Sequence, residues 1–256
     1  MHIDINCDMG ESFGTYTLGR DSEIIAQVSS ANIACGFHAG DPQVMARTVR
    51  LACDHGVAIG AHPGFPDLLG FGRRNMACSP EEVEAYLTYQ IGALQAFCTA
   101  NATRLHHIKP HGALYNMAVD NEDLVRAMAR TIARLDCTLI LVLLATGDNT
   151  RMAAIAREEG IAAAFEGFPD RAYTPQGTLV PRQQPGAVIV DPEEAAERAE
   201  RMVTEGVVRA VDGTLVPLVT QTLCVHGDNP SGVLLAAAIR RRLESVGIAI
   251  RPVQAE

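Results

Sequence analysis

Residues 3–11 read IDINCDMGE, in which apolar and polar side chains alternate over the first six positions. A period of two is typical of a β-strand, because successive side chains point to opposite faces of the sheet. The apolar positions 3, 5 and 7 suit packing against helices. Asp4, Asn6 and Asp8 would then point into the interior of a closed sheet, where polar groups need hydrogen bonds or a function.

Similar apolar runs recur along the chain and alternate with helical stretches. We expect strands over residues 3–7, 32–35, 57–61, 105–109, 138–144, 161–166 and 220–225, and helices over residues 42–55, 80–100, 121–134, 149–158, 192–205 and 230–245. Asp41, Ser79 and Asp191, each followed by proline, are expected to cap helices, and Asp120 marks a similar start. This alternation implies parallel strands with right-handed crossovers.

Both an open doubly wound sheet and a closed barrel satisfy that alternation. The polar clusters favour the barrel, because six polar side chains lie at or just beyond the ends of six different strands: Asp8, His38, His62, Lys109, Glu166 and His226. Six strand ends meet at one site only if the sheet closes, whereas an open sheet builds its site between two strands. We therefore predict one seven-stranded β/α (TIM-like) barrel domain over residues 1–256, with residues 169–190 lying over its mouth.

The composition narrows the class of protein. Apolar residues make up 48% and charged residues 20% of the chain, as in ordinary soluble enzymes. The net charge of −9 argues against binding nucleic acid or an anionic membrane, since both require a positive surface. No apolar run is long enough to span a membrane, the first residues MHID lack the basic and apolar pattern expected of a signal sequence, and the seven cysteines are scattered without a CxxC pair. We expect a cytoplasmic protein with reduced thiols.

Lys109 stands out because it is the single lysine among 21 basic residues, the other 20 being arginine. Codon bias explains an excess of arginine. A lysine that survives such a bias suggests a site where a planar guanidinium cannot replace the ammonium group. It lies in the stretch HIKPHGALYN, residues 107–116, where His107, Lys109 and His111 share one strand face. The structural alternative is a buried lysine paired with Asp4 or Glu166.

Several cluster residues have ordinary explanations. Asp41 caps a helix, Asp228 can cap the last helix, and Cys35 is more typical of a small core residue than of a nucleophile. The loop after residue 60 is rich in glycine and proline, and its Arg73 and Arg74 can bind an anion or lie in solvent.

Taken in order, these motifs resemble the LamB/YcsF family over nearly the whole chain, from Asp4 to about Asp228. The stretches that carry the resemblance are residues 4–11, 32–41, 60–67, 109–116, 166–173 and 226–228. The resemblance implies a seven-stranded barrel similar to glycoside hydrolases and deacetylases. It also implies cleavage of 5-oxoproline to glutamate with hydrolysis of ATP, in a complex with 5-oxoprolinase subunits B and C.

Strand-end position and residue chemistry select the candidate site. The expected catalytic residues are Asp8, His38, His62, Lys109, His111 and His226. The expected substrate-binding residues are Asn6, Glu11, Asn32, Arg73, Tyr115, Glu166 and Arg171. A divalent metal is a variant, with Asp8, His38 and His62 as its ligands, similar to the one-carboxylate, two-histidine sets of barrel deacetylases.

Opening the unstrained lactam ring needs an energy source, because the ring closes intramolecularly. ATP can supply it, but a chain with one lysine and no GxxxxGK[ST] stretch lacks a phosphate-binding P-loop. We therefore expect the partner subunits to perform most of the nucleotide chemistry. Other possibilities are a metal-dependent amidohydrolase, a Schiff-base lyase using Lys109, and a non-catalytic substrate-binding subunit.

Overall fold

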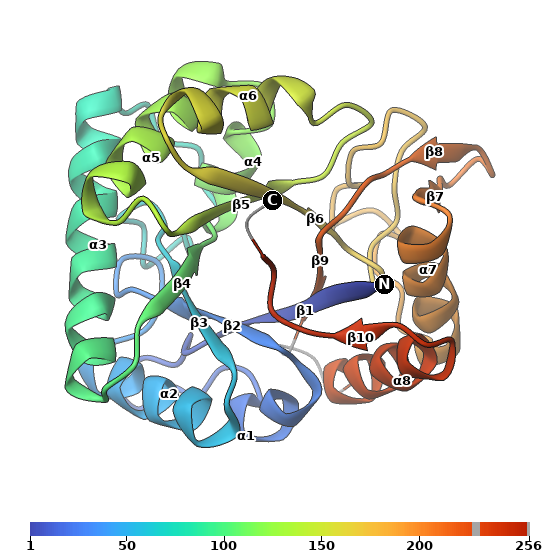
Figure 1. Ribbon diagram of the computed structural model, residues 1–256, viewed down its shortest axis with the longest axis horizontal. Helices are drawn as coiled ribbons and strands as arrows, with labels where there is room; N and C mark the ends of the chain where they lie inside the picture. The colour runs from blue at the N-terminus through green and yellow to red at the C-terminus, as the bar shows by residue number, and fades with distance from the viewer. Residues whose placement is uncertain (227–230, 255–256) are drawn as a thin grey trace.

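Seven parallel strands close into a barrel in the computed structural model, which describes residues 1–226 and 231–254 (Figure 1). β1 pairs with β2 on one side and with β9 on the other, which closes the ring β1-β2-β3-β4-β5-β6-β9. The bounds are β1 His2–Met9, β2 Ser30–Ala34, β3 Ala58–His62, β4 Leu105–Ile108, β5 Ile140–Leu144, β6 Ala162–Gly167 and β9 Thr222–Val225. The predicted seven-stranded barrel is thus confirmed, and the open sheet is excluded.

The six predicted helices surround the barrel (Figure 1): α2 Pro42–His55, α3 Pro80–Ala100, α5 Glu122–Leu135, α6 Thr150–Glu158, α7 Pro192–Thr204 and α8 Gly232–Ser245. Asp41, Ser79 and Asp191 accept backbone N–H groups at the starts of α2, α3 and α7, as predicted. The predicted cap of α5 was one residue off, because Asn121 and not Asp120 accepts the amide of the third helical residue. Asp228 lies outside the described residues.

Short elements escaped prediction. They are α1 Asp21–Ile24, the 3-10 helix η1 Ile25–Gln27, α4 Gly112–Met117, the antiparallel pair β7 Val207–Arg209 and β8 Leu215–Pro217, and β10 Ala249–Ile250. Elements of two to six residues are too brief to show a hydrophobic period, and contacts with the rest of the fold hold them in place. β10 pairs with the start of β1.

The apolar and polar side chains of β1 lie on opposite faces of the strand, as their alternation predicted. Ile3, Ile5 and Cys7 are buried in the apolar layer between barrel and helices. Asp4 and Asn6 are equally buried but contact polar groups of other barrel strands. The barrel therefore has an apolar outer layer and a polar lumen, and the polar lumen is where a site can form.

The lumen has room for large polar groups because facing positions are small. A Cβ atom added to Gly60 would lie 2.1 Å from Nε2 of His107, so a side chain at residue 60 is incompatible with this histidine. At the end of the barrel that holds the strand N-termini, Val253 packs with Ile140, Ala162 and Ala164. The segment after β10 thus covers that end, and in Figure 1 it crosses the middle of the ring.

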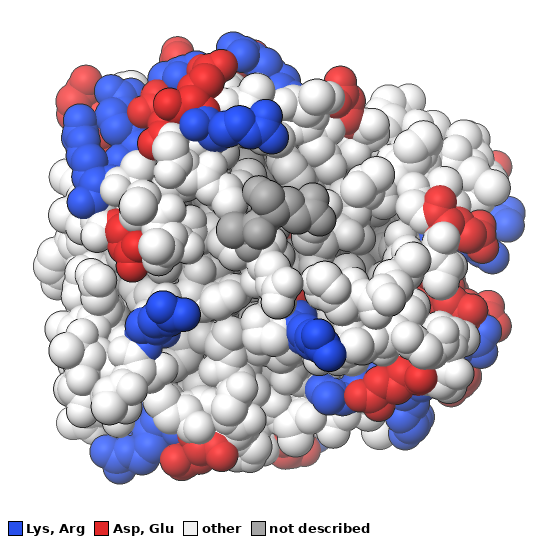
Figure 2. Space-filling view, viewed as in Figure 1, with Lys and Arg blue, Asp and Glu red and all other residues white. Residues whose placement is uncertain are grey.

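Figure 2 shows the face covered by this C-terminal segment, with acidic and basic side chains interspersed and mostly near its edge. The described residues on this face form no broad field of one sign. Among the described residues, no helix has the length and apolarity needed to cross a membrane.

Candidate active site

Lys109 occupies the centre of the lumen, directly after β4. Its Nζ lies 2.9 Å from Oδ1 of Asp8 and 2.9 Å from Oε1 of Glu166, which come from β1 and β6. Burial disfavours the ammonium, but the carboxylates outweigh it and raise the pKa of Lys109 well above its usual value. Although burial raises the pKa of Asp8, the neighbouring His62 and Lys109 outweigh it and hold this pKa well below its usual range. The lysine is therefore a fixed cation, and its partners are Asp8 and Glu166, not Asp4.

A chain of hydrogen bonds fixes the groups around this cation. Asn6 donates to Oε1 of Glu166 at 2.8 Å and accepts from Nδ2 of Asn32 at 2.7 Å. His107 donates to Oδ1 of Asn32 at 2.7 Å, and Tyr115 donates to Oε2 of Glu166 at 2.8 Å. Because nearly every polar group in this layer is paired, the side chains are held in one arrangement. Asn6, Asn32 and Glu166 thus lie beneath the cleft as its support.

Asp4 lies one layer deeper, away from Lys109. Three hydroxyl groups, from Ser29, Ser30 and Thr222, donate to its carboxylate at 2.6–2.8 Å. Burial raises its pKa to about 6 even though these donors favour the charged form. Asp4 therefore belongs to the packed lower lumen and not to the open site.

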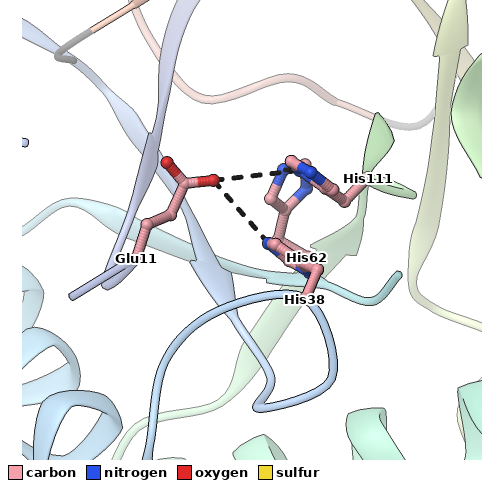
Figure 3. A group of neighbouring side chains, drawn as sticks. All are labelled: Glu11, His38, His62 and His111. Atoms are coloured by element: carbon pink, nitrogen blue, oxygen red, sulfur yellow. Dashed lines mark hydrogen bonds and ion pairs between the residues drawn. The ribbon is translucent and has the colours of Figure 1, made fainter. Parts of the chain in front are cut away.

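Glu11, His38, His62 and His111 gather at the ends of β1 to β4 (Figure 3), with ligand atoms all within 4.8 Å of one another. Nε2 of His62 lies 2.9 Å from Nδ1 of His111 and 3.3 Å from Oδ2 of Asp8. Oε1 of Glu11 lies 3.6 Å from Nε2 of His38 and 3.8 Å from Nδ1 of His111. The rings of His38 and His111 stack with their centroids 3.6 Å apart.

Backbone carbonyls fix which ring nitrogens carry hydrogen. Nδ1 of His62 lies 2.7 Å from the carbonyl oxygen of Lys109, and Nε2 of His111 lies 2.8 Å from that of Phe71. A carbonyl can only accept, so both of these nitrogens are donors. Nε2 of His62 and Nδ1 of His111 therefore face each other with lone pairs unless one is protonated. Burial and the neighbouring His62 lower the pKa of His111 to about 3, so this ring is neutral at neutral pH.

His38 also presents ring nitrogens that no described side chain or backbone group satisfies with a hydrogen bond. The side chain is fully buried, and neither ring nitrogen has a hydrogen-bond partner among the described residues. Burial lowers the pKa of His38 well below its usual value, which keeps the ring neutral. A neutral, buried imidazole with an unpaired nitrogen is a good ligand for a divalent cation.

The cluster differs from the predicted ligand set. His38 and His62 are shared, but Glu11 and His111 complete the group where Asp8 was expected. Gly10, with φ of 68°, turns the chain after β1 so that Glu11 reaches the histidines, while Oδ1 of Asp8 accepts from Lys109. Strand-end spacing contained no information about this turn.

A cleft of about 510 Å³ opens above Lys109. Its lining includes most of the predicted site residues: Asp8, Glu11, His62, Arg73, Lys109, His111, Tyr115 and His226. Residues 178–183 also line it, so part of the segment expected over the mouth does border the cleft. Arg171 lines it too, but its guanidinium donates to the carbonyls of Val180 and Ala187, which fixes this segment. Arg74 pairs with Asp67.

His226 follows β9 and lies beside the end of β6. Its Nδ1 is 2.5 Å from Oδ2 of Asp170, and its ring stacks on Phe168 with centroids 5.8 Å apart. Asp170 is not among the site residues predicted from the sequence. Its partner is 56 residues away, and only strand order, which places β6 beside β9, could have suggested the pair.

Known proteins resemble the chain over nearly its whole length. The LamB/YcsF family model matches residues 3–256. The chain is 56% identical to the A subunit of 5-oxoprolinase from Pyrococcus furiosus over 98% of both chains, and 54% identical to that of Pyrococcus horikoshii over 99% of this chain and 98% of the relative. The crystal structure of a lactam utilization protein from Thermus thermophilus superimposes with a TM-score of 0.91 at 51% identity, covering 98% of this chain and 99% of that one.

Proposed function

The chain belongs to the LamB/YcsF family, and we propose that it is the ring-opening subunit of a cytoplasmic, ATP-dependent 5-oxoprolinase. In this proposal it converts 5-oxoproline to L-glutamate together with subunits B and C. The observation that carries the proposal is the end-to-end match, at 54–56% identity, with relatives named as the A subunit of 5-oxoprolinase. The cleft above Lys109 supports it, because it combines a small volume with a fixed cation and several acid–base groups.

In this proposal the partner subunits bind ATP and transfer its phosphate. A lactam oxygen is a poor nucleophile towards phosphate, and the phosphates must be held during the transfer. The one lysine of this chain is already enclosed by Asp8 and Glu166 at 2.9 Å each. We infer that the partner subunits phosphorylate the lactam oxygen and that this barrel receives the activated ring.

Within the cleft, Lys109 would stabilise negative charge on the carbonyl or phosphate oxygen at the reacting carbon. Asp8 and His111 present a carboxylate oxygen and an imidazole nitrogen to the same cleft and would position and deprotonate water. Arg73, which lies over the Phe71 ring at 5.0 Å, would attract the substrate carboxylate.

The rival functions fit less well. A Schiff-base lyase needs a neutral amine, whereas the carboxylates of Asp8 and Glu166 keep Lys109 protonated. A chain that only binds substrate has no need for three buried, converging histidines.

A metal-assisted hydrolase is a second candidate, favoured by the four-residue cluster. Zinc ligands lie about 2.1 Å from the ion and so roughly 3.4 Å apart in a tetrahedron, near the spacing of His62 and His111. His38, His62, His111 and Glu11 would hold the ion, and Lys109 and Phe71 carbonyls would fix the rings. A cation there would supply Lewis-acid activation of water or of the carbonyl.

Metal analysis of the purified chain tests this candidate. We expect about one zinc or other divalent ion per chain after equilibration, and loss of that ion in His62→Gln. His55→Gln is the matched control, since this exposed histidine at the end of α2 lies outside the cluster, and it should retain the ion. Failure of the wild-type chain to bind zinc, manganese or cobalt at micromolar concentration would rule the metal out.

The isolated chain tests the division of labour. Without its partners it should release essentially no glutamate from 5-oxoproline, with or without ATP, because ring opening is uphill and the chain lacks a P-loop. Glutamate is measured by an enzyme-coupled assay. ATP-dependent glutamate release by this chain alone would contradict the proposal.

A further inference from the structure

His226 and Asp170 form the closest ion pair in the cleft that the proposed mechanism leaves without a role. The contact of 2.5 Å joins Nδ1 of the imidazole to Oδ2 of the carboxylate. The Asp170 side chain is 2% exposed, and its Oδ1 has no hydrogen-bond partner among the described residues. His226 is 14% exposed and lines the cleft. A buried carboxylate thus holds one nitrogen of an imidazole that reaches the substrate space.

The pair lies across the barrel from the histidine cluster. His62 ends β3, and His38 and His111 follow β2 and β4. Asp170 and His226 follow β6 and β9, which lie on the other side of the ring. Lys109 stands between the two walls, with its Nζ 5.6 Å from the Phe168 ring on which His226 stacks. A ring-shaped substrate above Lys109 would therefore meet different acid–base groups on its two sides.

Charged neighbours keep Asp170 ionised. Burial opposes the charge, but His226 and two arginines lower the pKa of Asp170 below its usual value. The titratable or charged groups that interact with this carboxylate, besides His226, are Arg171, Arg182, Tyr173, Arg198 and Cys224. The carboxylate accepts a hydrogen bond from Nδ1 of His226 and so fixes the orientation of that ring. On the opposite wall, burial holds His38 and His111 neutral.

We propose that His226 is the general acid that protonates the ring nitrogen as it leaves, and that Asp170 is the positioning residue that orients it. This inference rests on the proposed function. Its basis is the geometry: one wall carries water-activating groups and the other carries an imidazole anchored at Nδ1. The remaining ring nitrogen, Nε2, is then the proton donor, as in other carboxylate–histidine pairs.

The chemistry explains why such an acid is needed. Water adds to the carbon that bears the phosphorylated oxygen and gives a tetrahedral carbon that carries a hydroxyl group, the phosphate oxygen and the ring nitrogen. His226 gives its proton to nitrogen, the hydroxyl loses its proton to the opposite wall, and the C–N bond breaks as C=O forms. The product is an acyl phosphate, which a second water hydrolyses to glutamate and phosphate.

The competing route breaks the C–O bond to phosphate. Phosphate is a better leaving group than an unprotonated amine, so without the acid the intermediate returns to 5-oxoproline and the ATP is consumed without product. His226 therefore sets the coupling between ATP hydrolysis and ring opening.

The assembled complex tests this through phosphate released per glutamate formed. We expect a ratio near one for wild type. In His226→Gln, glutamate formation should fall by about 10²–10⁴-fold while phosphate release falls much less, so the ratio rises. The control is His55→Gln, an exposed histidine at the end of α2, which should match wild type. A parallel fall of glutamate and phosphate, or no fall, would overturn the role of His226. A wild-type complex that forms no glutamate would instead refute the proposed function.

Two measurements test the positioning role of Asp170, and the first of them uses the isolated chain. Nitrogen NMR of the isolated chain should show the hydrogen on Nδ1 of His226 in wild type and divided between the two ring nitrogens in Asp170→Asn, with partial recovery in Asp170→Glu. In the complex, kcat for glutamate formation should fall in the same order while KM for 5-oxoproline changes little, because the acid is no longer held in position. A purely structural Asp170 would change the melting temperature without moving the hydrogen between the nitrogens or splitting kcat from KM, and that result would refute its positioning role.

Discussion

A complex assembled with the Lys109→Arg chain should form glutamate nearly as slowly as one assembled with Lys109→Met, at least about 10²–10³-fold below wild type. The reason is shape. The ammonium fits between Asp8 and Glu166 and also contacts Cys224 at 3.2 Å. A planar guanidinium is wider and cannot take this position without displacing one of them. Turnover is measured as glutamate released per complex.

Stability separates the structural from the catalytic contribution of this lysine. Lys109→Met leaves the buried carboxylate of Glu166 and the partly buried carboxylate of Asp8 without their counter-charge, which should lower the free energy of unfolding by about 3–5 kcal/mol. The double variant Lys109→Met/Glu166→Gln removes one of those charges and should regain part of that stability but no activity. Thermal melting and turnover are measured on the same preparations. Full activity in Lys109→Arg, or recovery of activity in the double variant, would show that the lysine only supports the fold.

Asp8→Asn and His111→Ala should each reduce turnover of the complex by about 10²–10⁴-fold. Asparagine keeps the shape of Asp8 but loses the charge that faces Lys109 and His62. Alanine at residue 111 removes the nitrogen that faces His62. Both chains should still fold and join the complex, because Lys109 keeps Glu166 as its partner and the strands do not depend on these side chains.

Co-purification and circular dichroism check the assembly of these variants, and His55→Gln again provides the matched control. Turnover close to wild type in either variant would remove that residue from the mechanism.

The parts of the fold that local sequence determines were predictable. The alternation of Asp4, Asn6 and Asp8 with apolar residues placed them in the lumen, since side chains alternate strictly along a strand. Asp41, Ser79 and Asp191 cap helices through contacts within four residues. The convergence of polar strand ends then follows from closing the sheet.

Contacts made by loops were not predictable. Glu11 joins the histidines because the chain turns at Gly10. Asp170 meets His226 because β6 and β9 are neighbours, although 56 residues separate the two side chains along the sequence. The carbonyl of Phe71, which fixes the His111 ring, has no side-chain signature at all. In each case the partner is set by the path of the chain through space and not by residue type or spacing.

Reconstitution of ATP-dependent glutamate release from 5-oxoproline tests the central claim most directly. Partner subunits B and C are assayed with ATP, first alone, then with the wild-type chain, and then with the Lys109→Arg chain. The proposal predicts glutamate only when the wild-type chain is present. Equal rates in its absence, or with the Lys109→Arg chain, would contradict the conclusion that the ring is opened in this barrel.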